Sequence, residues 1–205
     1  MRDPSAAIIA HYERHATAWD ADRRRLAWGE RAWHGRFAGL LPAGAAVLDL
    51  GCGGAIPVAA GLIAHGVRVT GVDTSPTLLG LARARFPAET WIAGDMRTLA
   101  LARSFDGILA WDSFFHLSPP DQRRMFAVFA AHATPGSLLM LNTGPAHGVS
   151  MGSYRGDPLY HASLDAAEYR WLLARHGYAV LDHRVEAADA GGRTVWLAVA
   201  AQGSG

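Results

Sequence analysis

The feature that most constrains the fold is the buried run Val47-Leu48-Asp49-Leu50, which is followed at once by Gly51-Cys52-Gly53-Gly54. An apolar run of this length with one acid is typical of a strand covered on both faces, as in a parallel sheet. Glycines after it let the backbone bend and approach a ligand. A helix predicted to begin at Ile56 and Pro57 would direct N-terminal amides at the same place. We expect a nucleoside-cofactor site here rather than an ordinary strand-to-helix turn.

Two further acids follow predicted strands. The run Val67–Val72 ends at Asp73, at about the spacing from Gly51 that a nucleotide-binding βαβ unit uses for the acid that holds ribose hydroxyls. The short strand Thr90–Ala93 is followed by Gly94, Asp95 and Met96. The carboxyl ends of parallel strands lie at one edge of a sheet, so these acids should share a site.

Alternating strand and helix patterns predict an α/β fold with a doubly wound, mostly parallel sheet. Asp3 and Pro4 are typical of a helix start, and Gln202–Gly205 of a disordered tail. The expected helices are a prefix helix past Trp19 and the ranges 22–40, 55–65, 75–85, 119–131 and 165–176. The remaining expected strands are 105–111 and 137–142, with a closing hairpin of 178–185 and 194–200.

Composition limits the classes of function. The 205 residues are 50% hydrophobic and carry a net charge of +1, which predicts one folded domain and gives no basic surface for nucleic acid. No run suits a membrane span or a signal peptide, so we expect a cytoplasmic protein without a membrane partner. One cysteine excludes internal disulfides. The oligomeric state is left open between monomer and homodimer.

The loop resembles the acid-x-Gly-x-Gly-x-Gly motif of class I S-adenosylmethionine (SAM) dependent methyltransferases. Asp49, Gly51 and Gly53 match it, and Ala55 replaces the last glycine, a position that usually serves close packing and should tolerate one methyl group. The dinucleotide fingerprint of dehydrogenases fits worse, because Ile56 stands where its third glycine or alanine is needed. The resemblance covers residues 45–145 well.

The resemblance implies a Rossmann-like, seven-stranded sheet with an antiparallel last strand and N-terminal cap helices. It divides the single domain 1–205 into a helical cap (1–42), a SAM-binding core (45–145), a substrate lid loop (146–163) and a closing helix and β-hairpin (164–201). It also implies SAM as cofactor and S-adenosylhomocysteine as product. The expected cofactor-binding residues are Tyr12, Trp19, Gly51, Cys52, Gly53, Asp73, Thr74, Asp95, Met96 and Trp111.

The segment Trp111–Leu117 lies beyond the fourth strand, where a methyl group and its acceptor would meet. It lacks the Asn/Asp-Pro-Pro-aromatic signature of many nucleic-acid and protein amino methyltransferases, which favours a small-molecule acceptor. His116 and Asp112 are the candidate catalytic residues, with His116 as a base near neutral pH. The alternatives are a His116 packed under the next helix and an Asp112 that fixes its loop.

Residues 143–163 form the longest predicted connection, which should cover the acceptor. The candidate substrate-binding residues are Trp28, Phe115, His147, Tyr154 and Tyr160. Trp28 is included because it lies off the apolar stripe of its predicted helix. The histidines of this connection show no metal-ligand spacing, so no metal is expected.

The predicted function is transfer of the SAM methyl group to an O, N or S atom of a small molecule by in-line displacement. The first alternative is a SAM-binding protein of the same fold with other chemistry, such as cyclisation. The second is a cofactor-binding module without catalysis.

Overall fold

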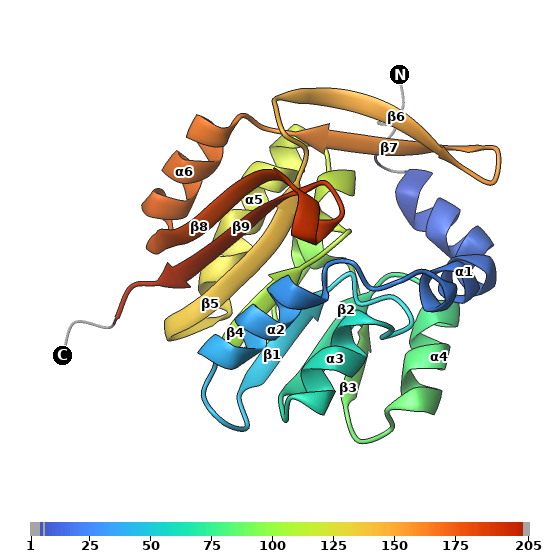
Figure 1. Ribbon diagram of the computed structural model, residues 1–205, viewed down its shortest axis with the longest axis horizontal. Helices are drawn as coiled ribbons and strands as arrows, with labels where there is room; N and C mark the ends of the chain where they lie inside the picture. Colours follow the sequence, from blue (N-terminus) through green and yellow to red (C-terminus); the bar gives the residue numbers. More distant parts are fainter. Residues whose placement is uncertain (1–4, 6, 203–205) are drawn as a thin grey trace.

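A twisted seven-stranded sheet forms the centre of the computed structural model, which describes residue 5 and residues 7–202 (Figure 1). Its strand order is β3 (Thr90–Ala93), β2 (Arg68–Asp73), β1 (Ala46–Leu50), β4 (Phe105–Ala110), β5 (Ala133–Thr143), β9 (Arg193–Ala200) and β8 (Tyr178–Ala187). The first five strands are parallel, and β9 is antiparallel to both of its neighbours. The predicted doubly wound sheet with an antiparallel last strand is confirmed.

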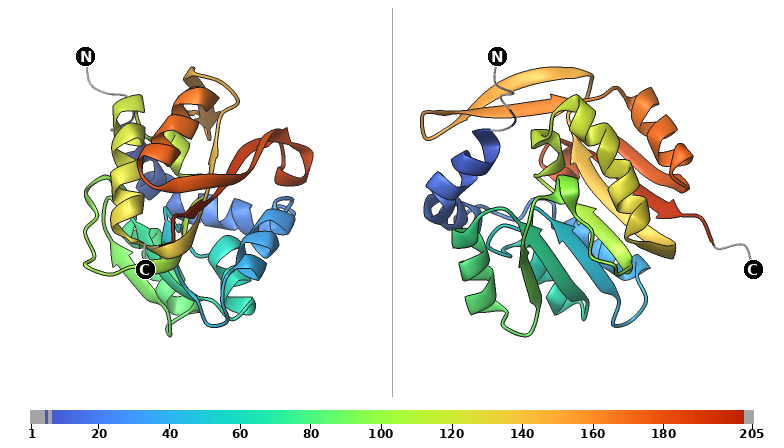
Figure 2. Two further views of the ribbon diagram at one scale, coloured as in Figure 1. Left: turned by 90° about the vertical axis from the view of Figure 1, so that its left-hand side faces the viewer. Right: turned by 180° about the vertical axis from the view of Figure 1, so that it is seen from behind.

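Helices cover both faces of this sheet (Figures 1 and 2). On one face are α2 (Arg31–Leu40), α3 (Val58–Ala64) and α4 (Pro76–Arg85), and on the other are α5 (Pro119–Ala131) and α6 (Ala166–Arg175). Short 3₁₀ helices include η2 (Met96–Thr98), η3 (Phe114–His116) and η4 (Ala188–Ala190). No helix in the described part of the chain is long and apolar enough to cross a membrane.

Two apolar cores hold these layers together, one on each face. Leu48 and Leu50 of β1 pack with the α5 and α6 side, whereas Val47 packs with Phe37 on the α2 side. This division follows from the strand geometry, because successive side chains point to opposite faces. Truncation of a buried phenylalanine such as Phe37 costs about 3 to 5 kcal/mol. Rigid packing on both faces therefore fixes where the ends of the central strands lie.

The prefix differs from its prediction. One helix, α1 (Ala7–Arg25), continues past Asp22, where a second helix was expected to begin, and α2 starts only at Arg31. Nothing between Trp19 and Arg25 disfavours a helix, whereas Gly29 lies in the turn that separates the two. The predicted helix start at Asp3 and Pro4 lies outside the described residues, as does most of the predicted tail.

The predicted lid loop is instead a β-hairpin. Strands β6 (Gly148–Tyr154) and β7 (Asp157–Ser163) pair antiparallel along their whole length. Their connection is the pair Arg155 and Gly156, both of which have positive φ, as a tight hairpin turn requires. In Figure 1 this hairpin crosses the top of the molecule above α1, and Figure 2 shows the same arrangement from behind. It therefore lies at the edge where the parallel strands end.

Candidate active site

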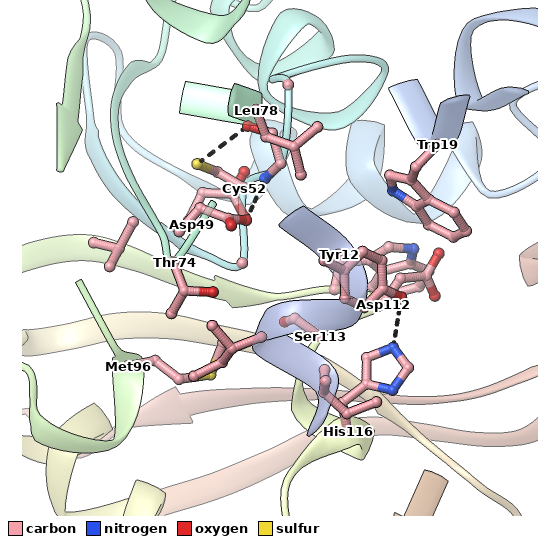
Figure 3. Close-up of a pocket in the computed structure, with 18 of the residues that line it drawn as sticks. Tyr12, Trp19, Asp49, Cys52, Thr74, Leu78, Met96, Asp112, Ser113 and His116 are labelled. Atoms are coloured by element: carbon pink, nitrogen blue, oxygen red, sulfur yellow. Dashed lines mark hydrogen bonds between the residues drawn. The ribbon is translucent and has the colours of Figure 1, made fainter. Parts of the chain in front are cut away.

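A deep cavity opens at the carboxyl ends of β1, β2, β3 and β4, beneath α1 (Figure 3). It encloses about 1160 Å³ of atom-free space, including its mouth. All ten residues predicted to bind the cofactor line it: Tyr12, Trp19, Gly51, Cys52, Gly53, Asp73, Thr74, Asp95, Met96 and Trp111. We refer to it as the cofactor cavity.

The glycine loop has a backbone that only glycine suits at its first position. Gly51 has φ +79°, and a Cβ there would collide with the side chain of Ser113. Ser113 is held in place because its hydroxyl donates to the carbonyl of Leu50 at 2.6 Å. The N–H groups of Gly51 and Cys52 both donate to the carbonyl of Val72, at 2.8 and 3.2 Å. The end of β1 is thus tied to β2 and β4 and approaches the cavity closely.

Ala55 occupies a left-handed backbone conformation. It has φ +70° and is buried, at the position where the family motif has its last glycine. From the sequence, we expected this position to serve close packing alone. The structure shows that it also needs a positive φ, which glycine adopts more readily than alanine. An alanine in this region costs roughly 1 to 2 kcal/mol. The helix that follows begins at Val58 rather than at Ile56.

Two carboxyl groups, the half-buried Asp73 and the buried Asp49, line the floor of the cofactor cavity. Asp73 accepts hydrogen bonds from the N–H groups of Gly53 (2.8 Å) and Ser75 (2.9 Å), and burial raises its pKa. Asp49 is 2% exposed. Burial, and secondarily the charge of Asp73, raises the pKa of Asp49 to about 7. A ligand that brings a cation or hydrogen-bond donors would compensate both groups.

Asp95 and Met96 form a different part of the wall. The carboxylate of Asp95 accepts the backbone N–H of Arg97 at 2.9 Å and pairs with its guanidinium at 2.5 to 3.0 Å. Burial would raise the pKa of Asp95, but these bonds to Arg97 lower it overall. Asp95 is therefore a fixed carboxylate beside Met96, whose methyl group lies near Gly51.

Helix α1 closes the cavity from above. Tyr12 and Trp19 point inward from it, with ring centroids 5.3 Å apart. The helix is fastened to α4, because the Asp20 carboxylate pairs with both terminal nitrogens of Arg85 at 2.5 and 2.6 Å. Glu13 also accepts the hydroxyl hydrogen bond of Ser75 at 2.5 Å. The lid over the cofactor cavity is thus an anchored helix.

A second cavity lies next to the first, under the β6–β7 hairpin, and we refer to it as the acceptor cavity. The residues that line both cavities are Tyr12, Trp19, Asp112 and His116. Those that line only the acceptor cavity include Phe115, His147 and His161, with Asn142 and Arg193 from the strand ends. The four shared residues form a wall between the two cavities.

His116 is held in one orientation and one tautomer. Its Nδ1 donates to the carbonyl of Tyr160 at 2.8 Å, so Nε2 accepts the hydroxyl hydrogen of Tyr12 at 2.7 Å (Figure 3). The side chain is 5% exposed, and burial lowers its pKa to about 4. The expected titration near neutral pH is therefore wrong, because desolvation disfavours the imidazolium.

Asp112 is committed to an ion pair. Its two oxygens accept from Nε and Nη2 of Arg193 at 2.6 and 2.7 Å, and Oδ1 also accepts from Nδ2 of Asn142 at 2.8 Å. Burial would raise the pKa of Asp112, but Arg193 lowers it overall. A carboxylate held in this way is a poor proton acceptor. The geometry favours the alternative interpretation, in which Asp112 fixes its loop.

The predicted substrate-binding residues are dispersed. Phe115 and His147 line the acceptor cavity. Tyr154 packs its ring on Trp19 at 5.3 Å and donates to Asp22, outside both described cavities. Tyr160 is buried and contributes the carbonyl that orients His116. Trp28 lies against Gly61 of α3, away from both cavities, because the break after α1 turns it toward that helix.

Sequence reasoning missed four polar residues that line one or the other cavity: Arg23 in the cofactor cavity, and Asn142, His161 and Arg193 in the acceptor cavity. The guanidinium of Arg23 pairs with Glu30 at 2.9 Å and lies 3.8 Å from Asp112. Asn142 carried a usable signal, since it is a polar residue at the end of a buried strand. Arg193 carried none, because its partner Asp112 is 81 positions away.

Comparison with known proteins agrees with this geometry. Residues 47–136 match the model of a family described as a methyltransferase domain. The chain is 33% identical over 113 residues to the ubiquinone biosynthesis O-methyltransferase of Xanthomonas axonopodis pv. citri (strain 306), covering 52% of this chain and 46% of that protein. It is 31% identical over 148 residues to the enzyme of that name from Coxiella burnetii (strain Dugway 5J108-111), covering 68% and 58%. The chain thus spans about half the length of these relatives.

A solved structure resembles nearly the whole chain. It is the 1,6-didemethyltoxoflavin-N1-methyltransferase of Burkholderia thailandensis, with bound 1,6-didemethyltoxoflavin and S-adenosylhomocysteine, at a TM-score of 0.77. The identity is 20%, over 98% of this chain and 92% of that one, so the likeness concerns the fold. The matched domain, the relatives and the solved structure are all methyltransferases, and the likeness of this chain to them agrees with the geometry of the two cavities.

Proposed function

We propose that the protein transfers the methyl group of SAM to an O, N or S atom of a small molecule. The observation that carries this proposal is the shared wall of Tyr12, Trp19, Asp112 and His116, which stands between two adjoining cavities. One cavity has the acids and glycine loop of a nucleoside site. The other is lined by aromatic and polar side chains, as an organic acceptor requires. Direct displacement needs such an arrangement.

The residues of the cofactor cavity fit SAM. In this proposal Asp73 accepts hydrogen bonds from the ribose hydroxyls, and Asp95 with the N–H of Met96 binds the adenine edge. The buried Asp49 carboxyl suits the ammonium group of the methionine part, because a nearby cation favours its charged form. The indole Nε1 of Trp111 is buried in the same cavity without a partner among the described residues. When bound, SAM supplies a methyl group activated by its sulfonium.

The residues of the wall position the acceptor and exclude water. Tyr12 donates its hydroxyl hydrogen to His116, so its oxygen is free to accept a hydrogen bond from the acceptor. Burial raises the pKa of Tyr12 strongly and lowers that of His116, so both are neutral at pH 7. We propose that this pair orients the attacking atom, with proximity rather than strong base catalysis as the source of rate. The ion pair of Asp112 and Arg193 keeps the wall rigid.

The proposal also covers the location, the partners and the oligomeric state of the protein. We place the enzyme in the cytoplasm, acting on a small-molecule acceptor without nucleic acid or membrane as partner, as a monomer or a homodimer. The net charge of +1 supports the absence of a nucleic-acid footprint. The alternatives are SAM chemistry within one molecule, such as cyclisation, and a module without catalysis. The acceptor cavity argues against both, since neither needs a second site next to the first.

The test is a mass-spectrometric screen. The full chain is incubated with SAM and pools of small metabolites, and each pool is examined for a methylated product together with S-adenosylhomocysteine. We expect both products from at least one pool and neither without an acceptor. Consumption of SAM without an acceptor and without S-adenosylhomocysteine would indicate cyclisation. SAM binding with no turnover in any pool would favour the non-catalytic module.

A further inference from the structure

Helix α1 carries a pair of histidines at the spacing of metal ligands. His11 and His15 are four positions apart, so they lie on one face of the helix, one turn from each other. Asp157, the first residue of β7, meets them from the hairpin. One ligand atom from each of the three side chains lies within 4.8 Å of the others. We propose that His11, His15 and Asp157 bind one divalent transition-metal ion, with Zn²⁺ as the best match.

The side chain of His11 supports this site independently of the spacing. It is 5% exposed, and its Nε2 is buried without a hydrogen-bond partner among the residues that the structure describes. A buried polar atom of this kind is costly unless a ligand or water satisfies it. The ring lies 4.9 Å from that of His15, centroid to centroid. A metal ion shared by the two imidazoles would remove this cost.

The type of ligand selects the type of metal. Two imidazoles and one carboxylate are the donors of many zinc sites, and they suit Zn²⁺, Ni²⁺ or Cu²⁺ better than Mg²⁺ or Ca²⁺, which prefer oxygen ligands alone. Three protein ligands leave a position for water in a tetrahedral site. Two contacts compete with the metal for Oδ2 of Asp157. His15 Nε2 shares a hydrogen bond with this oxygen at 2.8 Å, so the metal would take the place of the proton between them. Arg14 pairs with the same oxygen at 2.6 Å, but the Arg14 side chain is 64% exposed and can move into solvent when the metal binds.

The site would join the two parts of the molecule that cover the cavities. Helix α1 contributes Tyr12 and Trp19 to the shared wall, and the hairpin covers the acceptor cavity. In the structure, a hydrogen bond of 2.8 Å between His15 Nε2 and Asp157 Oδ2 connects α1 to the hairpin. None of the three ligands lines either described cavity. The metal would therefore act as a structural clip, and its binding can be measured whether or not the proposed methyl transfer is correct.

The experiment is a calorimetric titration of the full chain, free of affinity tags and of bound metal, with ZnCl₂. We expect one site per chain. His15→Ala, which removes a ligand, and Asp157→Asn, which removes the negative charge of a ligand, should each weaken binding by about tenfold or more. The control is His65→Ala, which removes an exposed histidine just after the end of α3 and should leave binding unchanged. Zn²⁺ should also raise the Tm of the wild type and leave that of His15→Ala unchanged.

Titration with Co²⁺ provides a spectroscopic readout that a merely structural role for these side chains would not produce. The wild type should develop the visible absorption of tetrahedral cobalt, and His15→Ala and Asp157→Asn should lose it. Circular dichroism checks that each variant is folded. The buried His11 is tested last, since its removal also affects packing. No Zn²⁺ binding by the wild type, or equal binding by both variants, would overturn the proposal.

Discussion

The cofactor cavity and the acceptor cavity share a wall but are built in different ways. The first is formed mainly by the ends of β1, β2 and β3, whose backbone and short loops carry the glycines and acids. The second is formed by side chains from η3, the hairpin and the ends of β5 and β9. Its walls are held by contacts distant in sequence, such as Tyr12 with His116 across 104 positions.

Because of this difference, related proteins can share the cofactor cavity while the acceptor cavity varies among them. The shape of the cofactor cavity follows from a sheet packed on both faces, so changing it would unfold the centre of the molecule. Strand β6 of the hairpin is largely exposed, including Val149 and Met151, and has no such role. On the proposed function, we therefore expect substitution in the hairpin to change the acceptor and to leave SAM binding intact.

The largest effect should come from shortening the hairpin. Gly152–Leu159 is replaced with Asn-Gly, a two-residue turn that connects Met151 to Tyr160. These two residues are paired in the native register, and Tyr160 keeps the carbonyl that orients His116. Turnover of an identified acceptor should fall by about 10²-fold or more, because water enters and alignment is lost. SAM affinity should change by less than about threefold. A parallel loss of SAM binding would break the proposed independence of the two cavities.

The next prediction compares glycines of the two regions. Gly51→Ala should lower the free energy of unfolding by about 2 to 5 kcal/mol, because its methyl group collides with Ser113 in addition to the cost of positive φ. Gly156→Ala in the hairpin turn, where nothing lies near the added Cβ, should cost only about 1 to 2 kcal/mol. Urea denaturation measures both. Equal costs would show that Ser113 does not confine the loop.

Much of the cofactor cavity could be predicted from sequence, because its signals are local. Glycines and acids at the ends of apolar runs place Gly51, Asp73 and Asp95 at one edge once the sheet is parallel. Tyr12 and Trp19 were added from the resemblance alone.

The acceptor side could not be predicted in the same way. The hairpin has no strong alternation of apolar residues, since most of β6 is exposed on both faces. Trp28 was misplaced because its position depends on where α1 ends. The pKa of His116 depends on burial by residues from η3, α1 and β7, which no local pattern encodes. Each of these features depends on contacts between residues that are far apart in the sequence.

A smaller effect concerns the pH dependence of SAM binding. In the free protein, burial raises the pKa of Asp49 to about 7, so the group is largely protonated at pH 6. An ammonium bound beside it lowers this pKa, so binding releases a proton and strengthens as pH rises through 7. The Kd should fall about fivefold from pH 6 to pH 7 and less than about twofold from pH 7 to pH 8. Asp49→Asn should remove this dependence, and a dependence that survives in the variant would assign it elsewhere.

The smallest effect should come from Ala55→Gly. Glycine removes the strain of φ +70° but makes the unfolded chain more flexible, so the free energy of unfolding should rise by only about 0.5 to 1 kcal/mol. The matched control is Ala59→Gly, within α3, which should lower stability by about 1 kcal/mol. Chemical denaturation measures the free energy of unfolding of the two variants. A loss of stability in both would mean that Ala55 is not strained.

The central claim is that the strand ends beneath α1 form a SAM site, and calorimetry with the purified chain tests it most directly. SAM and S-adenosylhomocysteine should each bind at one site per chain, whereas NAD should not bind. Asp73→Asn should weaken SAM binding by about tenfold, because ribose hydroxyls lose a charged partner. Binding of NAD in place of SAM, or an Asp73→Asn variant with unchanged SAM affinity, would contradict the assignment of this cavity.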